Sequence, residues 1–242
     1  MITVNPFKGF DLNASYGVYK NSWEQKIFRP TVQLAALNPD GTITTPTPAV
    51  SSLSYSRSGS LLTTFNAYAN YSLSIGGKHN LSAMVGMEAR QLSNQGYQMS
   101  RSNFSVNIPQ FGFGDPVTQR NNSSASGLSW LSQFGRLNYN FKGRYLLEAN
   151  LRHDGSSRFQ DKWGVFPSVS AGWRISEEKF LRDHVQWLSD LKIRASWGRL
   201  GNESIGQSYA ASDELSLNLL YNFNNTLYPA GAVTKLANRS TS

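Results

Sequence analysis

The segment LRHDGSSRF, residues 151–159, holds the residue types of a hydrolytic site in one short run. His153, Asp154 and the two serines could be interpreted as a Ser-His-Asp triad, but such triads are assembled from residues distant in sequence. His153 and Asp154 are neighbours, and on a strand their side chains would leave on opposite faces. The segment instead predicts a strand end and a turn, in which Gly155 permits an unusual φ and the Asp and Ser side chains cap backbone N–H groups.

Other catalytic and metal-binding patterns are weak. The chain has no cysteine, and its three histidines show no ligand spacing. Glu177 and Glu178 are adjacent, so they cannot lie on opposite sides of one glycosidic bond. They open the segment SEEKFLRDHVQW, which is predicted to be a short helix with a capping serine and acidic residues in its first turn. We expect no enzyme activity, no catalytic residue, no metal and no cofactor.

Composition and charge narrow the class of protein. Aromatic residues make up 12% of the 242 residues and charged residues 16%, and Gly, Ser and Asn are abundant, which favours an all-β fold. The net charge of +8 is dispersed without a basic run, so a nucleic-acid partner is not expected. The chain has no continuous apolar run long enough for a membrane-spanning helix, and no signal peptide is expected at its start.

Seven segments alternate apolar and polar residues, as strands with two different faces do. They are 10–20, 61–75, 79–90, 128–141, 144–154, 165–175 and 191–198. Several are long enough to cross a bilayer. Short connections at 76–78 and 142–144 alternate with long ones at 21–58 and 92–127.

This pattern predicts an antiparallel transmembrane β-barrel segment of about seven long strands, with short periplasmic turns and long outward loops. Three-residue turns would place Ile75 opposite His79 and Phe141 opposite Tyr145. A soluble, secreted β-sandwich that binds carbohydrate also alternates and stays open as an alternative.

Several blocks carry a resemblance to a known family. RHDGSSRF, then FPSVSAGWRISEEKF, then LKIRASWGRLGNESIGQSY resemble consecutive signature blocks of the SusC/RagA family of TonB-linked outer-membrane transporters. FGRLNYNFKGRYLLEANLRHDGSSRF and KHNLSAMVGMEAR resemble strands of that family, and the likeness is clearest over residues 60–210. The signature positions are Arg152, Asp154, Gly155, Ser156, Ser157, Arg158, Phe159, Phe166, Pro167, Ser168, Gly172, Trp173, Gly198, Gly201 and Asn202.

The resemblance implies an integral protein of the Gram-negative outer membrane in Bacteroidetes-type bacteria. It implies TonB-dependent uptake of oligosaccharides or peptides with a SusD-like surface lipoprotein, and coupling to the TonB complex through a plug domain. Because family barrels have about 22 strands, residues 1–242 are expected to form an incomplete barrel domain without plug or signal peptide. Open sheet edges cannot face lipid, so this chain alone is not expected to transport.

The resemblance also assigns the two faces of the strands. The polar face would line the lumen and would carry Arg136, Glu148, Asn150, Arg152, Arg174, Lys192 and Arg194. Arg136 would lie opposite Asn150 and diagonal to Glu148, as part of a charge ladder. Substrate contacts would come from aromatic residues of the outward loop 92–127, which can stack on sugar rings: Tyr97, Phe104, Phe111 and Phe113.

Overall fold

The computed structural model describes residues 1–32, 35–45, 50–185, 187–203 and 214–236, with the backbone alone described at 214–218, 229, 234 and 235. Nearly all regular structure in these ranges is β. The end of the third signature block, residues 204–209, and the chain end 237–242 lie outside the described residues.

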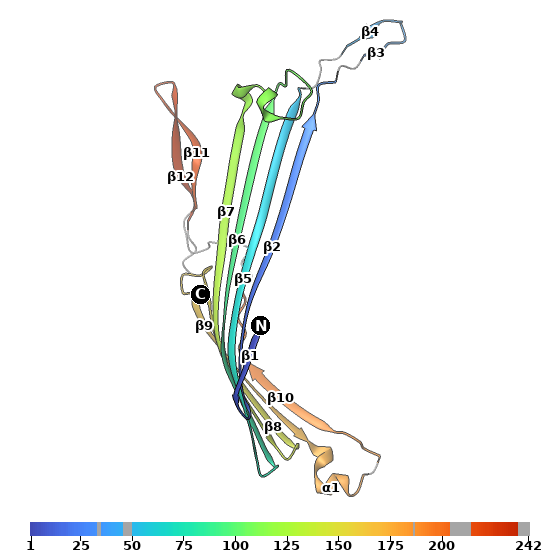
Figure 1. Cartoon of the computed structure of the whole chain (residues 1–242), viewed down its shortest axis with the longest axis vertical. Helices are drawn as coiled ribbons and strands as arrows, with labels where there is room; N and C mark the ends of the chain where they lie inside the picture. The colour runs from blue at the N-terminus through green and yellow to red at the C-terminus, as the bar shows by residue number, and fades with distance from the viewer. Residues whose placement is uncertain (33–34, 46–49, 186, 204–213, 237–242) are drawn as a thin grey trace. The chain divides into compact units, whose positions relative to one another are not determined.

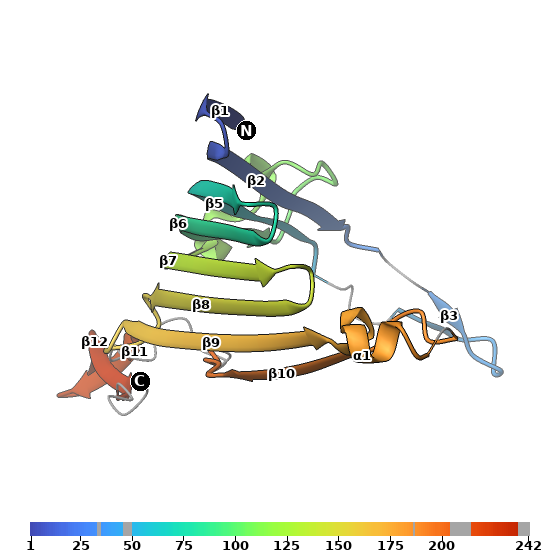
Figure 2. The same ribbon diagram turned by 90° about the horizontal axis from the view of Figure 1, so that it is seen from below.

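An eight-stranded antiparallel sheet dominates the structure, in the order β1-β2-β5-β6-β7-β8-β9-β10 (Figures 1 and 2). Its strands are β1 (Ile2–Phe7), β2 (Phe10–Arg29), β5 (Ser52–Ile75), β6 (His79–Ser102), β7 (Arg120–Phe141), β8 (Tyr145–Ser156), β9 (Trp163–Arg174) and β10 (Lys192–Gly198). Two separate hairpins pair β3 (Ala36–Leu37) with β4 (Ile43–Thr44), and β11 (Glu214–Phe223) with β12 (Thr226–Lys235). The predicted all-β antiparallel fold is confirmed.

The chain folds as two compact units. Unit 1 comprises Met1–Val18, Thr63–Gln91 and Leu128–Ser242, and unit 2 comprises Tyr19–Leu62 and Leu92–Gly127. Four long strands, β2, β5, β6 and β7, contribute residues to both units. Unit 1 contains the short turns and the signature blocks, and unit 2 contains the connections at the other ends of these strands.

The two short turns have the predicted length. β5 ends at Ile75 and β6 begins at His79, while Phe141 pairs directly with Tyr145 across the second turn. Lys142 and Gly143 have φ of 52° and 71°, and the Arg144 N–H donates to the Phe141 carbonyl at 3.0 Å, as in a type I′ turn. A non-glycine residue therefore shares the left-handed conformation that the sequence assigned to glycine.

All seven predicted strands exist, but the two long loops predicted at 21–58 and 92–127 are shorter than expected. β2, β5, β6 and β7 are 20 to 24 residues long, so they extend into the segments 21–58 and 92–127. In these extensions polar residues occupy both faces, as in RNNSSASG at the start of β7. Alternation of polarity is weak there, although backbone pairing continues.

Further strands were missed at both ends of the chain. β1 joins β2 through Lys8 and Gly9, with Gly9 at φ 82°, and β11 joins β12 through Asn224 and Asn225 at φ 48° and 59°. Two-residue loops of this kind are typical of β-hairpins. In the sequence, these two hairpins are indicated only by the Lys-Gly and Asn-Asn pairs, each of which lies between segments of alternating residues.

The link between β9 and β10 differs from the predicted capped helix. It contains the 3-10 turn η3 (Ile175–Glu177) and a single helical turn, α1 (Lys179–Arg182), whose N-cap Glu178 makes no side-chain capping bond. The Ser176 hydroxyl instead donates to Asp190 Oδ1 at 3.1 Å. The capping prediction is wrong because Ser176 lies within η3 and its hydroxyl bonds to Asp190, while Glu177 and Glu178 pair with arginines.

The described residues do not cover an apolar face of the sheet as a sandwich requires. Among the described residues, only Leu53, Phe104 and Leu128 are buried hydrophobic side chains, whereas large apolar residues such as Val85, Leu147 and Val169 are exposed. A sandwich buries one face of each sheet against the other. In the described part of the chain, no helix is long and apolar enough to span a membrane.

Candidate functional site: two faces of one sheet

A hydrogen-bonded ladder lies on the polar face of unit 1. Arg136 pairs in register with Asn150, and its Nε donates to Asn150 Oδ1 at 2.7 Å. Asn150 Nδ2 in turn donates to Glu148 Oε1 at 2.9 Å. The contact expected from the turn length is thus present, and the Glu148 charge is linked through one amide to the Arg136 charge.

Other predicted lumen residues lie near this ladder, and Glu148 belongs both to the ladder and to a neighbouring hollow. Glu148, Lys192 and Arg194 line a hollow of about 640 Å³ together with serine and asparagine side chains of β5, β6, β7 and β9. Arg152 pairs with Asp154 at 3.2 Å, and its guanidinium lies 5.7 Å from the Phe134 ring centroid. The polar face therefore offers charged groups of both signs around a solvent-accessible hollow.

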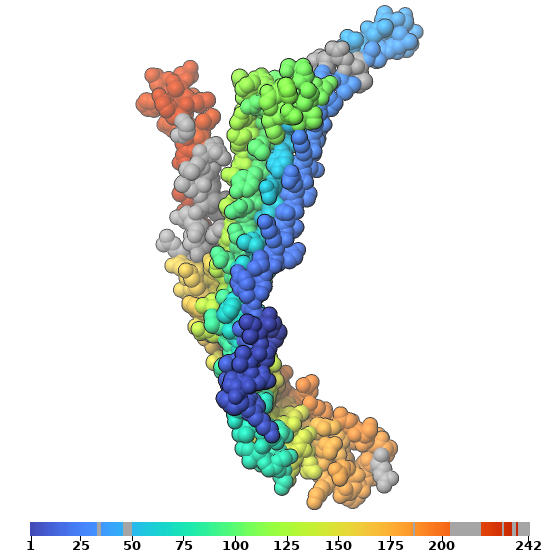
Figure 3. All heavy atoms as spheres, viewed as in Figure 1, coloured from blue at the N-terminus to red at the C-terminus, as the bar shows by residue number. Residues whose placement is uncertain are grey.

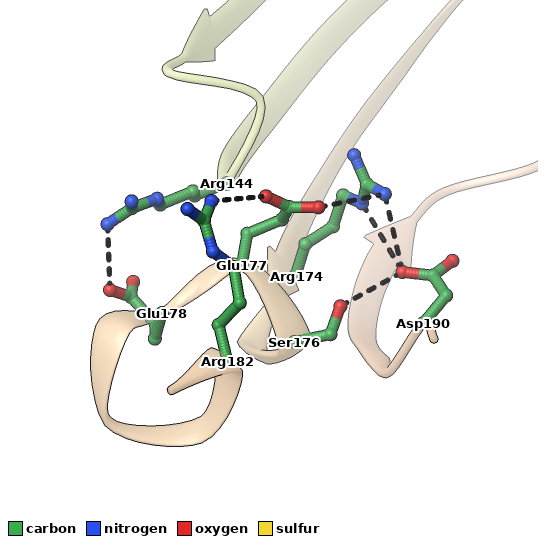
Figure 4. A network of polar contacts seen from close by, with 7 residues as sticks. All are labelled: Arg144, Arg174, Ser176, Glu177, Glu178, Arg182 and Asp190. Atoms are coloured by element: carbon green, nitrogen blue, oxygen red, sulfur yellow. Dashed lines mark hydrogen bonds and ion pairs between the residues drawn. The ribbon is translucent and has the colours of Figure 1, made fainter. Parts of the chain in front are cut away.

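Arg174 belongs to a different network, at the end of β9 (Figure 4). It pairs with Glu177 at 3.6 Å and with Asp190 at 3.4 Å, and Glu177 also lies 4.0 Å from Arg182. These ion pairs connect the two ends of the β9–β10 link. Arg174 thus holds the link against the strand end.

The block that suggested a triad does not form one. The His153 ring stacks on Trp163 at 4.5 Å and lies 3.4 Å from Gln133 Oε1, whereas Asp154 contacts Arg152. Because these partners lie on opposite faces of the sheet, His153 and Asp154 cannot act together.

Signature residues instead pack the end of β8 against its neighbours. Ser157 exchanges two hydrogen bonds with Ser129, each 2.9 Å long, and the half-buried Arg158 donates from its backbone N–H to Ser156 Oγ at 3.4 Å. Gly155 does not have the positive φ that the sequence suggested. It pairs with Trp163, and a Cβ on it would lie 2.8 Å from that ring.

The remaining signature positions extend this packing into β9 and β10. Cβ atoms added at Gly164 and Gly201 would both collide with the Phe166 ring, and one at Gly198 would lie 2.9 Å from Ser168 Cβ. The Pro167 carbonyl accepts from the Arg199 N–H at 3.0 Å, and Gly172 lines the polar hollow. Phe159 is half-buried in the turn after β8, and Asn202 follows β10. Most of these positions permit close approach of chain segments.

Aromatic rings form a row on the apolar face near the short turns. Phe7, Phe10 and Tyr71 contact one another, and a second group runs from His79 through Phe141 and Tyr145 to Trp173. Rings of this type gather at the membrane interface of outer-membrane barrels.

A second aromatic position lies further along β9. Trp163 precedes Trp173 by ten residues on the same face. At about 3.3 Å per residue and a tilt of about 40°, ten residues rise about 25 Å, the height of the apolar band of such barrels. The exposed apolar residues between the two tryptophans fit this band.

Glu178 fixes the aromatic row to the β9–β10 link. Its carboxylate accepts from the Tyr145 hydroxyl at 2.6 Å and from Trp173 Nε1 at 3.1 Å, and pairs with Arg144 at 3.1 Å. The side chain is 13% exposed. The hydrogen bonds from Tyr145 and Trp173 and the Arg144 charge hold the pKa of Glu178 below its usual value.

Replacing Glu178 with glutamine in the full-length receptor is expected to lower its thermal midpoint at pH 7. Because the pKa of Glu178 is depressed in the folded state, its contribution is present above the usual value of 4.5 and is lost as the pH falls through the lower folded pKa. The midpoints of wild type and E178Q should therefore converge below pH 4.5. The exposed Asp183 has no ion pair among the described residues, so D183N is the control and should match wild type throughout.

The four aromatic residues predicted for substrate contact occupy unit 2 in different ways. Phe104 is 8% exposed and packs edge-on against Phe28, and the Phe111 carbonyl accepts from Arg101 at 2.9 Å. Phe113 is 42% exposed in the 3-10 turn η1 (Phe111–Phe113). Tyr97 is 51% exposed and lies within β6, not in a loop. Of the four residues, only Phe113 and Tyr97 are exposed.

Comparison with known proteins supports the same class. Residues 3–237 match the family described as TonB dependent receptor-like, beta-barrel. The TonB-dependent receptor SusC of Bacteroides thetaiotaomicron is 38% identical over 148 residues, which are 60% of this chain and 14% of SusC. The TonB-dependent receptor P26 of Formosa agariphila is 37% identical over 142 residues, 56% of this chain and 14% of P26.

Solved structures agree on the fold. A RagAB peptide importer in a closed-closed state superposes with a TM-score of 0.82 at 22% identity, over 99% of this chain and 25% of that chain. A second RagAB peptide transporter structure gives 0.81 at 23% identity, over 98% of this chain and 25% of that chain.

The chain belongs to the β-barrel family of TonB-dependent receptors and is similar in sequence to SusC. Proteins of this family lie in the outer membrane and are transporters, not enzymes, so the expected location and the absence of a catalytic role are confirmed. The sandwich alternative is wrong. The chain spans 14% of the length of the curated relatives SusC and P26.

Proposed function

We propose that the full-length receptor containing this chain imports oligosaccharides or peptides across the outer membrane, energised through TonB and assisted by a SusD-like surface lipoprotein. Residues 1–242 contribute part of its barrel wall. The observation that carries the proposal is the family match over residues 3–237. The similarity to the RagAB peptide importer and to SusC supports the transport class.

The two faces of unit 1 suit this role. In the receptor, the face with Arg136, Glu148 and Asn150 lines the lumen, and the face with Val85, Leu147 and Val169 meets lipid. A polar lumen of mixed charge keeps the interior hydrated, and its charged groups satisfy one another through the ladder. Arg152, Arg174, Lys192 and Arg194 belong to the same lining. Direct substrate binding is assigned to unit 2.

Within unit 2, Phe113 is the foremost substrate contact and Tyr97 the second. An open aromatic face can stack on a sugar ring or on a peptide side chain, and Asn and Gln side chains nearby supply hydrogen bonds. Phe104 and Phe111 hold this segment in place. The Phe104 ring is buried, and the Phe111 carbonyl accepts a hydrogen bond from Arg101.

Uptake by cells that carry the full-length receptor tests the proposal. Labelled oligosaccharides or labelled peptides should enter wild-type cells and not cells without TonB, and a tagged receptor should co-purify a surface lipoprotein. F113A is expected to raise the half-saturating substrate concentration about two- to tenfold, the loss of one stacking contact. Val117 is 84% exposed close by in sequence, so V117A is the matched control. TonB-independent uptake, or no uptake of either class, would refute the proposal.

A further inference from the structure

The three tight turns of the eight-stranded sheet carry basic residues and no acidic ones. They are Lys8-Gly9 between β1 and β2, residues 76–78 between β5 and β6, and residues 142–144 between β7 and β8. Their charged side chains are Lys8, Lys78, Lys142 and Arg144. Arg144 is neutralised by Glu178 at 3.1 Å. The three lysines are exposed, and none has an acidic partner within 4 Å in the described part of the chain.

These lysines form a row along one end of unit 1. The Lys142 N–H donates to the Lys78 carbonyl at 2.7 Å, so the second and third turns are joined by their backbones. The Gly9 carbonyl accepts from the Ser72 N–H at 2.7 Å, which places the first turn beside the end of β5. Figure 3 shows the atoms of the β5–β6 turn, in teal, and of the link that holds α1, in orange, at this end.

The aromatic row lies directly next to the lysines in sequence, and Lys142 also lies next to it in space. Lys8 follows Phe7, Lys78 precedes His79, and Lys142 follows Phe141, with its Nζ 5.1 Å from that ring's centroid. Aromatic rings of this kind gather at the membrane interface of barrels, where a neighbouring lysine can reach headgroup phosphates. The short turns of outer-membrane barrels face the periplasm.

We propose that Lys8, Lys78 and Lys142 form a binding rim for anionic phospholipid headgroups of the periplasmic leaflet. The aliphatic stems pack beside the aromatic row while the ammonium groups reach the phosphates. The negative charge of Glu178 does not repel these headgroups, because it is paired with Arg144. Each lysine near an anionic surface should strengthen binding about fivefold, so the three together amount to on the order of a hundredfold.

The test uses the full-length receptor in a zwitterionic detergent, titrated with dilauroyl phosphatidylglycerol or dilauroyl phosphatidylcholine and followed by native mass spectrometry. Wild type should bind the anionic lipid more tightly than the zwitterionic one. In the triple variant K8Q/K78Q/K142N this preference should fall about fivefold for each lipid bound, on the order of a hundredfold for three bound lipids. Asparagine is chosen at 142 because it tolerates the left-handed conformation of that turn.

The matched control is K20Q/K26Q/K162Q, which removes three exposed lysines outside the turns. It should keep the wild-type preference, and heat-dependent gel mobility should show that all three proteins are folded. An equal affinity of wild type for the two lipids would overturn the proposal. So would an unchanged preference in the turn variant, or an equal loss in the control. None of these results depends on substrate transport.

Discussion

Replacing Val169 with arginine is expected to destabilise the inserted receptor by about 2–4 kcal/mol, the cost of a cationic side chain on the lipid face near the bilayer midplane. Val169 pairs with Ala149 of β8 and Trp197 of β10, and its side chain is exposed on the apolar face. It lies four residues from Trp173 and six from Trp163, close to the middle of the apolar band. Unfolding from lipid vesicles by guanidinium would measure the difference.

The neighbouring Ser170 provides the matched control for this substitution. It pairs with Glu148 and lines the polar hollow, so an arginine there meets water and a carboxylate. S170R should change stability little. If V169R and S170R had equal effects, the assignment of the two faces would be wrong.

Replacing Gly86 with alanine is expected to destabilise the fold by about 1–3 kcal/mol through overpacking. A Cβ at this position would lie 2.6 Å from Tyr68 Cβ and 2.7 Å from the Phe134 ring. The Arg152 guanidinium lies over the Phe134 ring, so a displacement of that ring by the new methyl group should also displace Arg152 on the polar face. The same guanidinium titration of the reconstituted receptor would show the loss.

Gly135 is the control because it lies beside Phe134 in β7 but has room. The nearest atom to a Cβ there is the Met84 carbonyl oxygen at 3.7 Å, an ordinary contact. G135A should therefore be neutral or slightly stabilising, since it restricts the unfolded chain. Equal destabilisation by G86A and G135A would show that strand propensity, and not the close approach at Gly86, sets the cost.

The strand cores and the two faces could be predicted because they depend on local alternation. Turn length fixes the register, and the register fixes which side chains meet, so the Arg136–Asn150–Glu148 contacts followed from Lys142-Gly143-Arg144 alone. The class of protein followed from signature blocks whose residues lie close together at the ends of β8, β9 and β10.

Features that depend on contacts between distant segments could not be predicted. Ser176 has the local pattern of a helix cap, yet its hydroxyl donates to Asp190 at the far end of the link. Gly155 lies in a sequence typical of turns, yet glycine is needed there because a Cβ would collide with the Trp163 ring. The strand extensions in unit 2 alternate only weakly because both of their faces are polar, so periodicity gives little signal there.

The most direct test of the account is a scan of spin-label accessibility along β9 in the full-length receptor, reconstituted in lipid. The chain contains no cysteine, so single cysteines can be introduced at Val165, Ser168, Val169, Ser170 and Ala171 without removing native thiols from this segment. The account predicts that labels at 165, 169 and 171 collide mainly with lipid-soluble oxygen, and those at 168 and 170 mainly with a water-soluble nickel chelate. An absent or reversed alternation would contradict it.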